Sequence, residues 1–443
     1  MTMPANLINA LFVLAVTLIW FMLAYQTALF FLGHRYYRAV QRSRACPTIP
    51  DEQLPPVSIL VPCHNEERVI AHSLKAMLAL HYPPDRFEIL VINDGSTDLT
   101  GEFARLFEGD GRVRVLDVPP ELAARGKSGA LNFGLRHAHH GLLAIYDADN
   151  TPEPEALRLL AEELEADASL GAAIGMYRVV NCRRNLLTRF LNIEGIGYQW
   201  IVQAGRWMLM RFNTLPGTNY VIRRSLVESL GGWDEAALTE DAEMSIRIYT
   251  AGSCIKFVPR SVSWEQEPET LCVWFRQRNR WVRGYNQLLR KYAGNALAVR
   301  PRRIGLEILY SLWLYYIFFF ATIISDACFL LGAAGLVRIT VPGPYTLVWA
   351  FAYATFVLQL VIALACEREQ DSVWNILLTM LMYFTYCQLW IPVVARAFYD
   401  DFIARAPLKW AKTERFEVSV EAIEPIRPLA GTGGSASERI GRV

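Results

Sequence analysis

The first feature of the chain is a long apolar segment without charged residues, from Leu7 to Gly33. At about 1.5 Å per helical residue it is longer than the ~30 Å hydrocarbon layer of a bilayer, so it predicts a transmembrane helix. A secretory signal peptide would begin with basic residues and have a shorter apolar run. Basic residues follow within 34–44, and the positive-inside rule then places the N-terminus outside and the next segment in the cytosol. Residues 1–44 are therefore a membrane helix with a basic flank.

Between residues 55 and 300, after a proline-rich linker at 45–56, short apolar runs alternate with amphipathic stretches. The first apolar runs are 57–62, 87–92, 113–118 and 142–147. Strands that alternate with helices predict an α/β domain with a mostly parallel sheet covered by helices. Ligands of such sheets bind at the carboxyl ends of the strands, so functional side chains are expected directly after these runs.

Long apolar segments return after residue 300. Three of them are each long enough to span a membrane: Ile304–Val337, Tyr345–Cys366 and Val373–Phe398. Residues 301–400 are thus a second membrane region with about three spans, and 401–443 are a polar tail with a disordered end. Three crossings put the tail outside, whereas its basic cluster favours the cytosol. A re-entrant or interfacial piece within Ile304–Val337 would remove this conflict.

Composition fits a chain that is only partly in a membrane. Of the 443 residues, 53% are hydrophobic and 20% are charged, which excludes both a wholly soluble and a wholly membrane-embedded protein. The net charge of +1 gives no general attraction for nucleic acid, so any anion site is local. The eight cysteines form no CxxC pair, which indicates a reducing compartment without a disulfide framework or a zinc site.

Polar residues follow the first two apolar runs, as expected for a site at the sheet edge. Asn65 and Glu66 follow one run, and Asp94 stands in NDGS after the next. Each group alone also suits a turn or a helix cap. Together on adjacent strands they predict a nucleotide pocket in which Asp94 accepts a hydrogen bond from a base or a ribose.

The stretch RGKSGALN (125–132) places Lys127 at the start of a predicted helix. It ends like a P-loop, but Glu121 stands where a P-loop requires its first glycine, so that reading is excluded. Lys127 is then either a solvated lysine or a group that holds a diphosphate or a carboxylate.

Two further acidic motifs follow. In YDADN, Asp147 and Asp149 come directly after an apolar run, and neighbouring carboxylates need a cation between them. Their hard oxygen ligands suit Mg²⁺ or Mn²⁺ completed by phosphate oxygens, although DxD also occurs by chance. In LTEDAE, Thr239 suits a helix cap with acids in the first turn, and a carboxylate near a sugar donor also suits a general base.

The stretch VWFRQRNRWVRGY (273–285) combines basic and aromatic residues without an acid. On a helix they form two stripes: Arg276, Arg280 and Arg283, and Trp274, Trp281 and Tyr285. Such a helix fits a membrane surface, or an active site where arginine binds a diphosphate and tryptophan stacks on a sugar. No nucleic-acid-binding module surrounds it. We expect an interfacial helix whose outer residues meet the bilayer while Gln277, Arg280 and Trp281 face the active site.

These motifs occur in a recognisable order: INDGS, YDADN, LTEDAE and QRNRW. The order resembles the D, DxD, TED, Q(Q/R)xRW signature of membrane-embedded processive family 2 glycosyltransferases. That group includes cellulose, chitin-oligosaccharide, hyaluronan and poly-N-acetylglucosamine synthases. The resemblance covers about residues 55–292 and implies a GT-A fold, a Rossmann-like nucleotide-sugar-binding domain flanked by transmembrane helices. One departure is Asn93, where the group often has a second aspartate.

The resemblance also implies roles for particular residues. Asp241 would be the catalytic base, and Asp94, Lys127, Asp147 and Asp149 would bind the nucleotide donor. Asp149 and Asp147 would hold Mg²⁺ or Mn²⁺. The diphosphate and the acceptor sugar would lie among five further residues: Glu240, Gln277, Arg278, Arg280 and Trp281.

The activity implied is inverting transfer from a nucleotide sugar, a UDP-linked hexose or N-acetylhexosamine, to build a β-linked polysaccharide and pass it across the membrane. Two alternatives stay open: a non-processive enzyme that adds one or a few sugars to a lipid, and an inactive nucleotide-binding membrane scaffold. The implied partners are the nucleotide sugar, the glycan or lipid acceptor, the bilayer and accessory export subunits, but no nucleic acid. The implied location is the cell (inner) membrane, multi-pass, with the catalytic domain in the cytosol.

Overall fold

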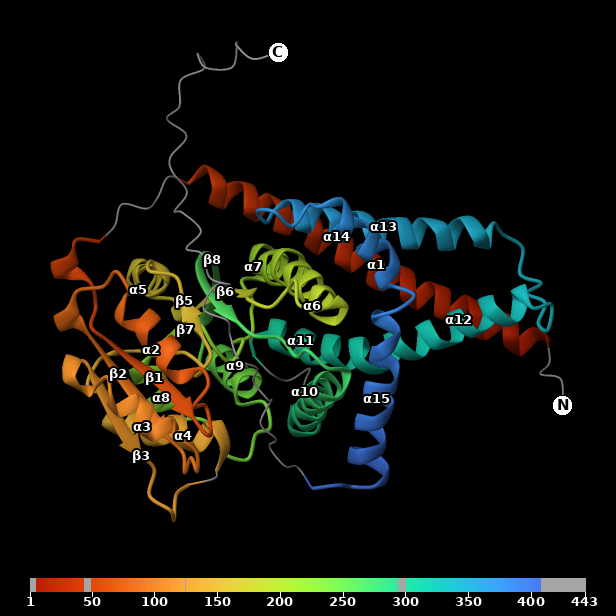
Figure 1. Cartoon of the computed structure of the whole chain (residues 1–443). Coiled ribbons are helices and arrows are strands. Elements are labelled where there is room, and N and C mark those ends of the chain that lie inside the picture. The colour runs from red at the N-terminus through yellow and green to blue at the C-terminus, as the bar shows by residue number, and fades with distance from the viewer. Residues whose placement is uncertain (1–4, 44–48, 124, 293, 295–299, 408–443) are drawn as a thin grey trace, which may run out of the picture.

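A computed structural model of the chain describes residues 5–43, 49–123, 125–292, 294 and 300–407 (Figure 1). Its centre is a mixed eight-stranded sheet in the order β3-β2-β1-β4-β7-β6-β8-β5. In chain order the strands are Val57–Cys63 (β1), Phe87–Asn93 (β2), Val113–Asp117 (β3), Leu142–Ile145 (β4), Thr151–Pro152 (β5), Leu170–Val179 (β6), Tyr220–Arg223 (β7) and Cys254–Glu265 (β8). The four apolar runs predicted as strands are β1 to β4. The end of the predicted polar tail, 408–443, lies outside the described residues.

The first half of the sheet is parallel, as the alternation of strands and helices predicts. β1 pairs in parallel with β2 and β4, and β2 pairs in parallel with β3. Side chains of β1 and β2 are buried on both faces of the sheet, which is why these strands appear as unbroken apolar runs. β7 runs antiparallel to β4 and β6, so the second half is mixed.

Helices cover the sheet. They are Ile70–Leu78 (α2), Thr100–Arg105 (α3), Gly126–His137 (α4), Ala156–Ala166 (α5), Arg224–Ser229 (α8) and Glu240–Thr250 (α9). In α5 the buried residues Leu157, Leu160, Ala161 and Leu164 recur at helical spacing and pack on the sheet. The parallel half thus has the layered α/β arrangement that positions ligand groups at the strand ends.

The apolar segments form long helices beside this domain. They are Ala5–Arg42 (α1), Arg302–Leu312 (α11), Phe319–Ala333 (α12), Tyr345–Ala365 (α13), Val373–Met382 (α14) and Trp390–Phe398 (α15). Four segments are long and apolar enough to cross a membrane: Asn6–Arg42, Arg302–Gly332, Tyr345–Ala365 and Val373–Ile403. In Figure 1, α1, α12 and α13 extend together to one side of the sheet domain, and α15 runs across their direction.

The α1 helix is held on the sheet domain by a helical pair that the sequence pattern did not predict. This pair is Leu186–Gly197 (α6) and Ala204–Met210 (α7), joined by a π-helical turn. A Cβ atom at Gly205 would lie 2.4 Å from the carbonyl oxygen of Leu29, and one at Gly33 would lie 2.0 Å from that of Trp200. Glycine at these two points therefore allows the helix backbones to touch.

The contact at Gly205 gives a stability prediction. Gly205→Ala places a methyl group against the α1 backbone, so it should lower the free energy of unfolding by about 1–3 kcal/mol, as overpacked cores do. The check is the thermal unfolding midpoint of the full chain in detergent. Gly109→Ala is the matched control, because no atom lies within 4 Å of a Cβ built there. Equal midpoints for the two variants would contradict the close crossing.

Candidate active site

One cavity of about 670 Å³ is lined by all ten residues to which the sequence motifs and the resemblance assign a role. It begins at the carboxyl ends of β1, β2 and β4 and reaches the helices α10 (Leu271–Tyr292), α12 and α13. The predicted residues that line it are Asp94, Lys127, Asp147, Asp149, Glu240, Asp241, Gln277, Arg278, Arg280 and Trp281. The structure therefore brings together groups that lie up to 187 positions apart in the sequence.

The first acids lie where the parallel strands end, as expected. Asp94 follows β2 and is buried, and its carbonyl oxygen lies 2.7 Å from Nδ1 of His64, which follows β1. Asp147 and Asp149 follow β4, the neighbour of β1 on the other side. Because β1, β2 and β4 are parallel neighbours, their carboxyl ends bring these acids to one edge of the sheet.

Lys127 lies between two acidic motifs. Its ammonium donates to the carboxylate of Asp147 at 2.5 Å and to the carbonyl oxygen of Gly217 at 2.7 Å, and it lies 3.8 Å from the carboxylate of Glu240. Burial acts to lower the pKa of Lys127, but Asp147 and Glu240 raise it above its ordinary value. The structure thus has Lys127 against acidic side chains rather than in solvent.

A loop that the sequence motifs did not indicate completes this part of the cavity. Gly217 has a φ of +88°, and a Cβ atom there would lie 3.1 Å from Oδ2 of Asp241, so glycine lets the loop approach the acid. The hydroxyl of Thr218 accepts from the backbone N–H of Asp147 at 3.0 Å. The short stretch LPGTN before β7 carries ordinary turn residues, and only its position marks it as part of the site.

Asp241 has a proton affinity well above that of an ordinary carboxyl. It stands in the first turn of α9 and is half-buried, and its Oδ1 accepts from the backbone N–H of Ala242 at 2.8 Å. Burial and the neighbouring Glu240 raise its pKa to about 7, against the opposing effect of the Ala242 N–H, Lys127 and Arg280. A carboxylate with this pKa can accept a proton at neutral pH and is suited to general base catalysis.

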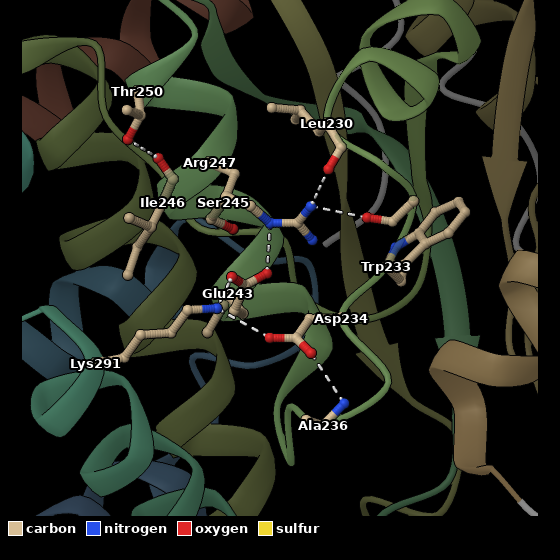
Figure 2. Close-up of polar contacts among 12 residues, drawn as sticks. Leu230, Trp233, Asp234, Ala236, Glu243, Ser245, Ile246, Arg247, Thr250 and Lys291 are labelled. Carbon is tan, nitrogen blue, oxygen red and sulfur yellow. Dashed lines mark hydrogen bonds and ion pairs between the residues drawn. The ribbon is translucent and has the colours of Figure 1, made fainter.

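A network of charged side chains around the buried Glu243 fixes the helix that carries Asp241 (Figure 2). Glu243, also on α9, pairs with Arg247 and with Lys291 of α10, both at 2.7 Å. Lys291 also pairs with Asp234 at 2.9 Å, and Arg247 donates to the carbonyl oxygens of Leu230 and Gly232 at 2.8 Å. The sequence pattern had explained Glu243 as a first-turn acid; in the structure it joins α9 to α10.

The α10 helix contains the stretch 273–285, and its contacts correct part of the expectation. Gln277, Arg280 and Trp281 line the cavity as expected. The aromatic stripe does not meet lipid at Trp274, which is 1% exposed and packs against Tyr386 and Trp390. The tryptophan is internal because the apolar segment Val373–Ile403 folds back over this face of α10.

The basic stripe of α10 is only partly exposed. Arg276 is exposed. Arg283 instead pairs with Asp401 at 2.8 Å. Arg278, which the resemblance implied for the diphosphate or acceptor, is buried and pairs with Glu194 at 3.0 Å. The α10 helix is thus covered by protein on the face where a membrane was expected.

The carboxylates of Asp147 and Asp149 fit a divalent metal ion only if a bound ligand supplies further oxygen atoms. Asp147 and Asp149 offer hard carboxylate oxygens at the strand end, and Asp149 is buried. Within the described ranges no group of three or more His, Cys, Asp or Glu residues could hold a metal ion by itself. Two carboxylates plus phosphate oxygens from a bound nucleotide would supply the missing ligands, as the sequence motif predicts.

Comparisons with known proteins agree with this arrangement. Residues 55–284 match the family described as "Glycosyltransferase like family 2". The chain is 40% identical over 412 residues to "Probable glycosyltransferase YdaM" of Bacillus subtilis (strain 168), covering 92% of this chain and 98% of that protein. It is 30% identical over 275 residues to the poly-beta-1,6-N-acetyl-D-glucosamine synthase of Staphylococcus aureus (strain COL), covering 61% of this chain and 65% of the synthase.

A solved structure shares the fold. The mannosyltransferase PcManGT from Pyrobaculum calidifontis, in complex with GDP-Man and Mn²⁺, superimposes with a TM-score of 0.57 at 20% identity, covering 88% of this chain and 99% of that one. Together with the mixed sheet and the apolar helices at both ends, this confirms the predicted GT-A fold class.

Proposed function

The chain belongs to the family 2 glycosyltransferases and is a hexosyltransferase by class, and on this premise we propose that it builds a β-linked polysaccharide from a nucleotide sugar. The donor we propose is a UDP-linked hexose or N-acetylhexosamine. The similarity to a poly-N-acetylglucosamine synthase supports an N-acetylhexosamine. We further propose that the growing chain passes into the membrane region of the same protein.

One observation carries this proposal: the cavity is continuous from the acids of the sheet edge to the apolar helices. Its far part is lined by aromatic and polar side chains of α12, α13 and the segment 383–391, among them Phe319, Thr322, Phe356, Tyr383 and Trp390. Aromatic rings with polar edges suit the faces and hydroxyls of a sugar chain. A transferase that adds one sugar to a soluble acceptor needs no such extension.

The proposed reaction uses groups that lie around the near part of the cavity. Asp94 holds the nucleoside. Asp147 and Asp149 would hold Mg²⁺ or Mn²⁺, which would stabilise the negative charge of the diphosphate leaving group. The Asp241 carboxylate takes the proton of the acceptor hydroxyl. The acceptor oxygen attacks the anomeric carbon as its bond to the diphosphate breaks, which inverts the configuration at that carbon. Arg280 and Gln277 lie beside the departing nucleoside diphosphate.

The structure also supports a membrane topology in which the segment Val373–Ile403 does not cross. The start of α1 lies at the loop 334–344, since Asn9 donates to the hydroxyl of Thr340 at 2.6 Å. The loop before α14 instead lies on the sheet domain, where Arg178 pairs with Glu367 at 3.0 Å. The end of the segment also lies there, with Asp401 bound to Arg283. We propose that α1, α11–α12 and α13 cross, and that Val373–Ile403 returns to the cytosolic side.

This topology places the sheet domain and Arg405 in the cytosol, as the positive-inside rule requires. It moves the re-entrant piece from Ile304–Val337, where we expected it, to the last apolar segment. The N-terminus and the loop 334–344 then lie on the outer side of the cell membrane.

The proposed role of Asp241 predicts a pH dependence. The base must be ionised, so the transfer rate should fall as the pH drops below about 7, the pKa of Asp241. Asp241→Asn should lower kcat by about 100-fold or more with donor affinity retained. Glu240→Gln should move the acidic limb of the profile to lower pH, because Glu240 raises that pKa. The exposed Asp85→Asn is the control; a wild-type rate for Asp241→Asn would refute the assignment.

Product length tests the proposed function itself. Purified protein is given a panel of UDP- and GDP-sugars with Mg²⁺, Mn²⁺ or EDTA, and the products are sized by mass spectrometry. We expect a polymer from one UDP-sugar, loss of product in EDTA, and recovery when either metal is added. A product of one sugar on a lipid would establish the non-processive alternative, full activity in EDTA would remove the metal role, and no turnover of any donor would favour the scaffold.

Cysteine labelling tests the proposed topology. In a variant without its eight native cysteines, Arg338→Cys and Ala404→Cys place a single thiol at an exposed position on each proposed side. An impermeant maleimide should label Arg338→Cys in intact cells and Ala404→Cys only after permeabilisation. Labelling of Ala404→Cys in intact cells would show that the last apolar segment crosses.

A further inference from the structure

One carboxylate lies at the junction between the two parts of the cavity. Glu194, on α6, lines the cavity and accepts hydrogen bonds from three donors: Nη2 of Arg278 at 3.0 Å, the hydroxyl of Tyr386 at 2.7 Å and the indole N–H of Trp390 at 3.1 Å. The donors come from α10 and from the apolar segment Val373–Ile403. A single side chain therefore links three elements that are far apart in the sequence (Figure 1).

Arg278 connects this carboxylate to Trp281, the platform on which the acceptor sugar is expected to stack. Arg278 is 2% exposed, and its guanidinium carbon lies 3.9 Å from the ring centroid of Trp281 and 5.8 Å from that of Trp390. Glu267 adds a second, longer ion pair at 4.0 Å. A cation that is stacked on a ring and held by a carboxylate fixes the orientation of that ring. Trp281 also lines the cavity, so its orientation decides how a sugar can stack there.

Glu194 also fixes the side chains that line the cavity beyond the Trp281 platform, where its membrane part begins. The hydroxyl of Tyr386 accepts from the indole N–H of the buried Trp274 at 3.2 Å while it donates to Glu194. Trp390 lines the cavity next to Glu194 and Arg278. The same carboxylate therefore sets the position of Trp281 on one side and of Trp390 on the other.

We propose that Glu194 is a positioning residue that aligns the Trp281 platform with the entrance to the membrane part of the cavity, and so determines how long the glycan is retained. This inference rests on the proposed polymerase function. A glycan that spans both aromatic groups stays bound between transfers only if the two are aligned. Without alignment, dissociation competes with the next transfer, and the products become shorter although the chemical step is unchanged.

Substitution of Glu194 separates this role from a purely structural one. Glu194→Gln keeps the shape but removes the charge that balances the buried Arg278, so Trp281 and Trp390 lose their common anchor. Glu307→Gln is the matched control, because Glu307 forms a buried ion pair with Arg206 at 2.9 Å and does not line the cavity. A general loss of stability should appear in both variants, whereas a change in product length should appear only in Glu194→Gln.

The experiment uses the full chain in detergent or nanodiscs and measures product length, together with kcat and acceptor KM for the first transfer onto a short acceptor. For Glu194→Gln we expect mean product length to fall and acceptor KM to rise, each by about tenfold, with kcat within about twofold of wild type. Glu194→Asp should restore part of the length. Glu307→Gln should make polymer of wild-type length.

Three outcomes would overturn the inference: wild-type length from Glu194→Gln, an equal loss of length in Glu307→Gln, or a loss of kcat without a change in acceptor KM. If Glu194→Gln does not fold, Tyr386→Phe and Trp390→Phe each remove one donor and are measured in the same way. A wild-type chain that adds only one sugar would instead contradict the proposed function. In that case the acceptor KM of Glu194→Gln still decides whether Glu194 positions the acceptor.

Discussion

The structure of the site depends on the position of Lys127, whose ammonium group lies among several acidic side chains. Asp147 and Glu240 come from different motifs, and without a positive charge between them they would repel each other at the sheet edge. Lys127 contacts both, so α4 must begin next to β4 and α9. Asn132 of α4 supports this arrangement by exchanging two 2.8 Å hydrogen bonds with the backbone of Trp233, in the loop before α9. The position of α9, which carries the proposed base Asp241, thus follows from the need to neutralise Asp147 and Glu240.

Lys127 does not form a direct ion pair with Asp241. The lysine ammonium hydrogen-bonds to Asp147 and to the Gly217 carbonyl, whereas Asp241 accepts from a neutral backbone N–H. A direct ion pair with Lys127 would lower the pKa of Asp241 and weaken it as a base. Burial and the neighbouring Glu240 do the opposite and raise the pKa of Asp241 to about 7. Two adjacent acids in LTED therefore have different tasks: Glu240 stays with the lysine, and Asp241 is left able to take a proton.

Local pattern predicted the parts of the fold that repeat along the chain. The strands β1, β2 and β4 are buried on both faces and appear as apolar runs, and the acids at the ends of β2 and β4 follow from parallel pairing with β1. The antiparallel β7, the α6–α7 pair and the Gly217 loop depend on contacts between distant segments, and no short pattern encodes them. Hydropathy likewise measures length and composition, so it could not show that Val373–Ile403 folds back onto α10. Arg278 is a further example. Its motif implied a contact with the diphosphate or the acceptor sugar, but its partner in the structure is Glu194, from a helix that the sequence pattern did not predict.

The sheet domain and the membrane helices are joined by buried polar contacts rather than by apolar packing alone. Asp401 accepts from Arg283 at 2.8 Å and from Asn286 at 2.7 Å, and Glu367 holds both Arg178 and the indole of Trp200. A buried charged side chain that loses its partner is strongly penalised. These pairs therefore fix the register between the two parts. The proposed polymerase function needs that register, because a glycan held on both sides of the boundary would have to meet the same path after every transfer.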